Sequence, residues 1–95
     1  MKYKIDVVRI RENSIELNGW VIGKTPQSRA EFQVQDGNRE PVEFRYVATR
    51  RDDVSQIYYK QVYDRDYGFD IRFPYTRGAD YWLLIRCDGK TARIK

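Results

Sequence analysis

The chain has 95 residues and a mass of 11.4 kDa, the size of a single domain. Residue types that suit a pleated sheet (Val, Ile, Thr, Tyr, Phe, Trp) far outnumber Ala, Leu and Met, which excludes a helical bundle. The absence of His excludes His-dependent catalysis, and the net charge of +4 is too scattered to predict a nucleic-acid partner.

Turn-forming residues recur about every ten positions, and apolar and polar residues alternate in the short segments between them. Seven strands are predicted, at 2–11, 14–22, 30–35, 42–49, 68–73, 81–87 and 90–94. Short strands with short connections favour an all-β fold, an Ig-like antiparallel β-sandwich of about seven strands with one short helix. Residues 1–95 are therefore expected to form one β-sandwich domain.

Three tight turns support antiparallel pairing. Asn13 separates the first two strands, and Asp36-Gly37 follows the third. Asp88-Gly89 separates the last two strands. Glycine accepts a positive φ, so both Asp-Gly pairs predict hairpins.

Side chains that alternate along a strand share one face of the sheet. The apolar sets expected to face the core are Ile15, Leu17 and Val21; Phe32 and Val34; Val42, Phe44 and Tyr46; Phe69, Ile71 and Phe73; Tyr81, Leu83, Ile85 and Cys87. Trp20, which follows Gly19 in a strongly apolar strand, is also expected in the core.

The segment 50–66 breaks the alternating pattern. Val54, Ile57 and Tyr58 have helical spacing, which predicts a short helix at about 53–59 that bridges the two sheets. Asp52 or Asp53 is expected to cap its first turn. Ion pairing of Asp53 with Arg51 is a better interpretation of this charged cluster than acid–base catalysis.

Asp64 and Asp66 have the Asp-x-Asp spacing that holds a divalent cation in many sugar-nucleotide enzymes. Such a pair works beside a nucleotide-binding α/β sheet, which this chain lacks. The two residues are expected in a solvated loop, with no metal and no cofactor.

Aromatic residues suggest a second kind of site, because sugar rings stack on aromatic side chains. The candidates for glycan binding are Trp82, Tyr58, Tyr59 and Tyr63. Trp82 has the opposite parity to its inward-facing neighbours, so it is either exposed or part of a strand that is buried on both faces.

The compartment follows from the single cysteine and from the lack of long apolar segments. Cys87 has no second cysteine with which to form a disulfide, which suits a reducing compartment. The first residues lack the apolar segment of a signal peptide, and no stretch is long enough for a membrane span. A cytoplasmic domain is expected.

Four segments in order, at 3–6, 17–21, 51–54 and 67–71, carry the pattern Ile-Asp, Gly-Trp, Arg-x-Asp-Val and Gly-Phe. This order resembles the small, often N-terminal, β-sandwich domain of bacterial, mainly Gram-positive, family 2 glycosyltransferases that build surface polysaccharides. The residues that carry the resemblance are Gly19, Trp20, Arg51, Asp53, Val54, Gly68 and Phe69. Asp52 stands where that pattern often has Pro.

The resemblance implies a non-catalytic accessory module, cut from a longer chain, whose partner is a glycosyltransferase catalytic domain in that chain. It implies a role in interaction or substrate positioning, with membrane association through the parent enzyme. It supplies no catalytic residues. The alternatives are a free-standing, weak carbohydrate-binding β-sandwich and, less favoured, a small enzyme or metal protein built around Asp64 and Asp66.

Overall fold

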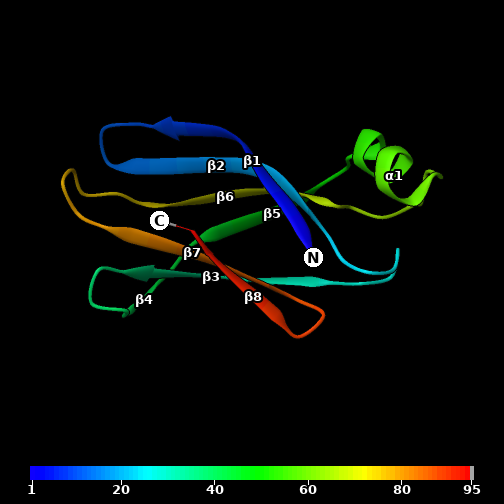
Figure 1. Ribbon diagram of the computed structural model, residues 1–95. Helices are drawn as coiled ribbons and strands as arrows, with labels where there is room; N and C mark the ends of the chain where they lie inside the picture. The colour runs from blue at the N-terminus through cyan, green and yellow to red at the C-terminus, as the bar shows by residue number, and fades with distance from the viewer. Residues whose placement is uncertain (95) are drawn as a thin grey trace.

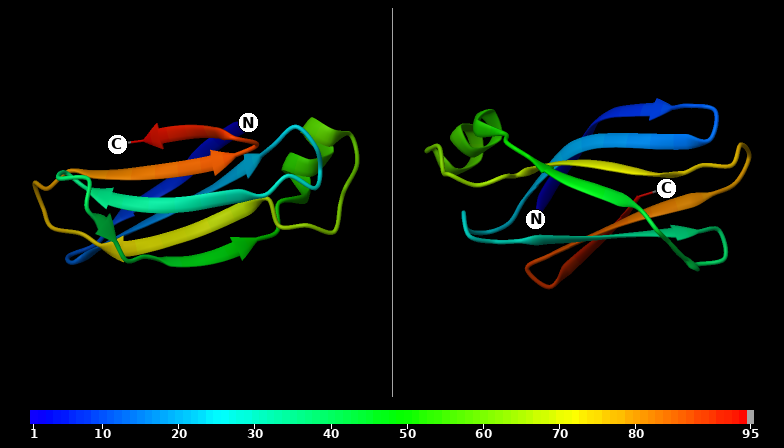
Figure 2. Two further views of the ribbon diagram at one scale, coloured as in Figure 1. Left: turned by 90° about the horizontal axis from the view of Figure 1, so that it is seen from below. Right: turned by 180° about the vertical axis from the view of Figure 1, so that it is seen from behind.

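The computed structural model describes residues 1–94, which form two antiparallel four-stranded sheets packed face to face (Figure 1). The first sheet has the order β1 (Lys2–Ile10), β2 (Ser14–Ile22), β6 (Gly68–Pro74) and β5 (Arg45–Thr49). The second sheet has the order β4 (Pro41–Val42), β3 (Ala30–Asp36), β7 (Tyr81–Cys87) and β8 (Lys90–Ile94). The helix α1 (Asp52–Tyr59) lies beside one end of the sandwich (Figure 2).

The strand order is that of an Ig-like sandwich. The first sheet corresponds to the A, B, E and D strands of an Ig constant domain. In the second sheet, β3, β7 and β8 correspond to C, F and G, and β4 is added beside C. The predicted all-β sandwich is therefore confirmed.

The predicted single strand at 42–49 is wrong, because two strands in different sheets occupy this segment. β4 pairs with β3 at only two positions, and β5 pairs along its whole length with β6. The chain crosses between the sheets at Glu43 and Phe44. Both strands keep the same alternation of apolar residues, so the periodicity of the sequence does not reveal the crossing.

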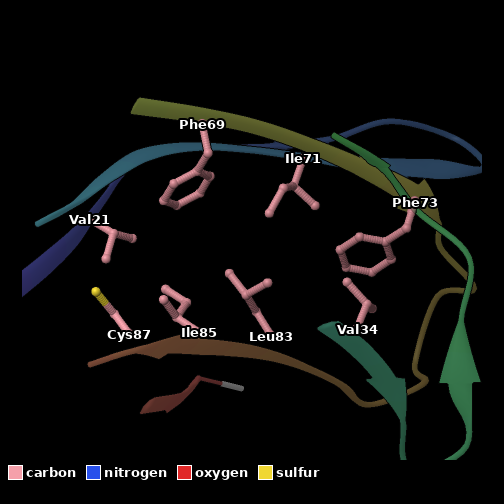
Figure 3. Close-up of a cluster of buried hydrophobic side chains, with 8 residues drawn as sticks. All are labelled: Val21, Val34, Phe69, Ile71, Phe73, Leu83, Ile85 and Cys87. Carbon is pink, nitrogen blue, oxygen red and sulfur yellow. The ribbon is translucent and has the colours of Figure 1, made fainter. Parts of the chain in front are cut away.

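The core lies between the two sheets and confirms most of the predicted inward-facing side chains. Its buried members are Val21, Val34, Phe69, Ile71, Phe73, Leu83, Ile85 and Cys87 (Figure 3). Tyr46 is an exception to the prediction, because it is 45% exposed. It faces the same side as the core residues, but β5 is an edge strand and leaves its ring at the open side of the sandwich.

A second apolar cluster lies between the first sheet and α1. Trp20 is 8% exposed, as expected for a core residue, but it belongs to this cluster together with Ile22, Val54 and Tyr67. Trp20 points to the outer face of β2, because its neighbour Val21 faces the main core. The helix thus covers apolar side chains that would otherwise face water.

The short helix is confirmed at Asp52–Tyr59, but two expectations about its role and its cap are wrong. The helix connects β5 to β6, which are neighbours in one sheet, and so it does not bridge the two sheets. Its buried residues are Val54 and Ser55, whereas Ile57 is 59% exposed. Its N-cap is Arg51, without a side-chain capping hydrogen bond, because the carboxylates of Asp52 and Asp53 are bound to arginines instead.

The two Asp-Gly turns agree only in part with the prediction from the sequence. Asp88 and Gly89 both have positive φ (53° and 76°), as a tight hairpin between β7 and β8 requires. In the turn after β3, the positive φ (63°) belongs to Arg39 and not to Gly37. The carboxylate of Asp36 orders that turn by accepting hydrogen bonds from the backbone N–H groups of Asn38 and Glu40.

Candidate functional site

The four segments that carry the resemblance meet in one junction between β1, β2, α1 and β6. Asp6 lies at a bulge in β1, where the register with β2 shifts. Its carboxylate accepts a hydrogen bond of 2.7 Å from Arg51, and Arg51 also forms a bidentate pair with Asp53, with both bonds at 3.0 Å. These bonds raise the pKa of the Arg51 guanidinium, and the bond from Arg51 lowers the pKa of the Asp53 carboxyl.

The two glycines of the junction are required by close packing. A Cβ atom on Gly19 would collide with the carbonyl oxygen of Lys4 and lie 2.9 Å from the ring of Phe69. A Cβ atom on Gly68 would collide with Thr49 and lie 2.7 Å from a side-chain carbon of Arg51. The residues of the resemblance therefore hold α1 on the first sheet, and their roles in this structure are structural.

The four aromatic residues predicted to bind glycan do not form one platform. Trp82 points to the outer face of β7, where the guanidinium of Arg93 lies 4.2 Å from the centre of its ring. Tyr58 belongs to α1, which covers the outer face of the other sheet, and its ring centre is 5.2 Å from that of Trp20. The two residues therefore lie on opposite outer faces of the sandwich.

Tyr59 and Tyr63 serve the packing of α1. The hydroxyl of Tyr59 donates to the carbonyl oxygen of Gly23 at 2.8 Å, in the connection between β2 and β3. Its ring meets the edge of Tyr63 at a centre-to-centre distance of 6.1 Å. Burial raises the pKa of the Tyr59 phenol further above its ordinary value.

Sequence reasoning missed Ser55, which is fully buried within the first half of α1. Its hydroxyl donates to the carbonyl oxygen of Gln61 at 2.6 Å and accepts from the backbone N–H of Tyr63 at 3.2 Å. These two bonds close the loop after the helix, where Lys60 adopts a left-handed φ of 62°. No sequence motif identifies such a serine, because its partners are six and eight residues away.

Asp64 and Asp66, the predicted Asp-x-Asp pair, have different neighbours in the structure. The carboxylate of Asp64 is bound to Arg50 at 2.5 Å, and its side chain is otherwise exposed. Within residues 1–94 there is no group of three or more Asp, Glu, Cys or His side chains placed to hold a metal ion. Asp66 lies instead at the rim of a hollow described below.

A hollow of about 510 Å³ opens at the side of the sandwich, between β3 and β5, and is called the edge groove here. It is lined by Val21, Ser28, Arg29, Ala30, Phe32, Tyr46, Ala48, Asp64, Arg65, Asp66, Tyr67 and Gly68. The groove is open because β4 pairs only with the last part of β3 and because β5 ends the first sheet. Ala30 and Ala48, which are small, leave space at positions that face inward.

The rim of the edge groove carries charges of both signs. Arg29 and Asp66 are exposed, and neither side chain forms an ion pair or a hydrogen bond with another residue in the described part of the chain. Arg65 is half-buried and donates to the carbonyl oxygen of Gln27 at 3.4 Å. The pKa of the Tyr46 phenol is raised by burial and by the carboxylate of Asp66, which lies within electrostatic reach of that phenol.

A second hollow, of about 320 Å³, lies between the two sheets near β1 and β8. Its lining is mostly aliphatic and aromatic and includes Val8, Ile10 and Ile94. It offers few hydrogen-bonding groups to select a ligand. The edge groove, which combines apolar walls with unpaired charged groups, is therefore the better candidate for a functional site.

Comparisons of the chain with protein-family models, with curated proteins and with solved structures find no match. The resemblance to glycosyltransferase accessory domains therefore stays a prediction from the four sequence segments. Among residues 1–94, no helix has the length and apolar character needed to cross a membrane.

Proposed function

We propose that this chain is a non-catalytic binding module that positions a substrate for a family 2 glycosyltransferase catalytic domain. The edge groove carries the proposal, because its exposed Arg29 and Asp66 are not used to hold the fold together. The resemblance of the four sequence segments is the support for the enzymatic context. We also propose a cytoplasmic location, with membrane association through the parent enzyme.

The electrostatics of the carboxylates support a binding role over a catalytic one. A general acid needs a pKa raised toward neutrality, usually by burial in an apolar pocket. The pKa of Asp53 is instead lowered by Arg51, and Asp64 is paired with Arg50 at the surface. Neither carboxyl group has the surroundings of a general acid.

A turnover assay tests the non-catalytic part of the proposal. The isolated chain is incubated with nucleotide sugars and oligosaccharide acceptors, with and without Mn²⁺, and released nucleotide is measured. We expect no turnover above the protein-free control. Turnover that disappears in Asp64→Ala contradicts the proposal and favours the enzyme hypothesis.

The coding sequence downstream of Lys95 separates the accessory role from the free-standing alternative. An α/β domain with its own Asp-x-Asp pair supports a module attached to a glycosyltransferase. A stop codon directly after Lys95 contradicts attachment through this end and favours a free-standing carbohydrate-binding protein. Both alternatives use a binding groove, so the experiment below applies to either.

A further inference from the structure

We infer that the edge groove binds an uncharged glycan of one or two sugar units, with Tyr46 as the stacking surface and Arg29 and Asp66 as hydroxyl partners. This inference rests on the proposed binding function and adds the class of ligand and the residues that recognise it. It moves the site away from Trp82 and Tyr58, to which the sequence pointed.

The apolar part of recognition comes from Tyr46. Its ring centre is 5.2 Å from that of Phe32, with 31° between the ring planes, so one aromatic side chain supports the other. Phe32 packs in turn on Phe69 in the core, at 5.0 Å between ring centres. Tyr46 thus offers a partly exposed ring that is already ordered, which lowers the entropy cost of binding a sugar face.

The polar part of recognition comes from the balance of charges at the rim. Sugar hydroxyls both donate and accept hydrogen bonds, so they can accept from the Arg29 guanidinium and donate to the Asp66 carboxylate. A phosphate would be attracted by Arg29 and Arg65 but repelled by Asp66, and a cation would meet the reverse, so neither ion finds a rim of one sign. Asp64 is paired with Arg50, which leaves Arg29 and Arg65 against Asp66, a net excess of only one positive charge at the rim.

The size of the groove agrees with a small ligand. Its volume of about 510 Å³ lies within the range of about 300–1,000 Å³ that is usual for small-molecule sites. The groove is open at the side of the sandwich, so a longer glycan could extend beyond it. With one stacking ring and two hydroxyl partners, we expect a modest Kd, on the order of 1 mM.

The experiment is an NMR titration of the ¹⁵N-labelled chain at 50 and 500 mM NaCl. The uncharged probes are cellobiose, maltose and N,N′-diacetylchitobiose, and the anionic probes are inorganic phosphate and glucose 1-phosphate. We expect an uncharged disaccharide to shift the amides of Phe32, Tyr46 and Asp66 with a Kd that is nearly independent of salt. A phosphate-driven interaction would weaken steeply between the two salt concentrations.

Single substitutions test the roles of Tyr46 and Asp66 in binding. We expect Tyr46→Leu to weaken binding about tenfold, which is the loss of about 1.4 kcal/mol. Asp66→Asn is expected to weaken it several-fold without affecting the core, because Asp66 is exposed. Glu40→Gln removes the same charge outside the groove, and Trp82→Leu removes a ring on another face; both should bind like the wild type.

The outcomes separate the inference from the function on which it rests. Shifts in the groove with the anionic probes only would overturn the glycan assignment while leaving a binding groove. Sugar-induced shifts at Trp82 or Tyr58, lost in Trp82→Leu or Tyr58→Leu but retained in Asp66→Asn, would overturn the location. No shift with any probe at 10 mM would overturn both the inference and the proposed binding function.

Discussion

Asp88 shows how a single side chain can connect distant parts of this chain. Its carboxylate accepts a hydrogen bond of 2.7 Å from the backbone N–H of Lys24 and one of 2.9 Å from the hydroxyl of Ser28. The β7–β8 turn is thereby joined to the connection between β2 and β3. The bond from Lys24 is the main reason why the pKa of Asp88 is lowered.

At the residue scale we predict that Asp88→Asn reduces the loss of stability in acid. Because folding lowers the pKa of Asp88, its contribution is fully present above the unfolded value of about 3.8 and is lost as pH falls through the folded value. Asn accepts the left-handed φ of this position but does not titrate. Melting temperatures measured from pH 7 to pH 2 should therefore fall less in the variant.

The contribution of Asp53 to acid sensitivity is the same in both proteins, so the difference between the two curves isolates Asp88. Curves that run parallel over the whole pH range would show that the Lys24 and Ser28 bonds do not depend on the charge of Asp88.

At the scale of elements, α1 depends on the sheet beneath it. A helix of eight residues is too short to be stable alone in water, so tertiary contacts must hold it. These contacts are the cluster of Trp20 with Val54 and the ion pairs of Arg51 with Asp6 and Asp53. Since the ion pairs are partly exposed, most of the stabilisation comes from the buried apolar groups.

We predict that Trp20→Ala lowers the free energy of unfolding by about 3–5 kcal/mol, because it removes the largest side chain under α1. The amides of α1 should lose more hydrogen-exchange protection than those of β7. Trp82→Ala is the matched control, because Trp82 is only half-buried and lies on the other sheet. An unchanged melting temperature in Trp20→Ala would refute the assignment of this cluster.

At the scale of the whole molecule, the main core joins both sheets. Cys87 belongs to this core, so the reactivity of its thiol measures whether the core is intact. The thiol is 2% exposed, and burial raises its pKa above the ordinary value. A thiol reacts as the thiolate and only when a reagent can reach it. Cys87 should therefore be protected as long as the two sheets stay packed.

We predict that a disulfide reagent labels Cys87 very slowly in the native protein at pH 7.5. Labelling should accelerate in urea over the range in which circular dichroism reports loss of the sheets. Rapid labelling without denaturant would mean that the end of β7 opens on its own, and the described packing of Cys87 would then be incorrect.

The edge groove illustrates why part of the candidate site could not be predicted from the sequence. Arg29, Tyr46 and Asp66 come from three connections or strands that are far apart in the sequence, and none belongs to a local motif. In the sequence, Asp66 stands out only through its spacing from Asp64, which suggests a metal pair. Residue type alone suggests Tyr59 and Tyr63 as glycan-binding residues, but both pack α1 against its surroundings.

The sequence by itself determined the local features of this protein, which depend only on residues that are close together in the chain. Alternation along each strand predicted that Phe69, Ile71 and Ile85 face the core, and the pair Asp88-Gly89 predicted the last hairpin, because strand faces and tight turns are local properties. Only the tertiary structure decided that 42–49 divides between two sheets and that Trp20 lies under a helix. It also decided that β5 is an edge strand, which leaves Tyr46 at an open groove. These features depend on which strands become neighbours, and that choice is made by packing across the whole molecule.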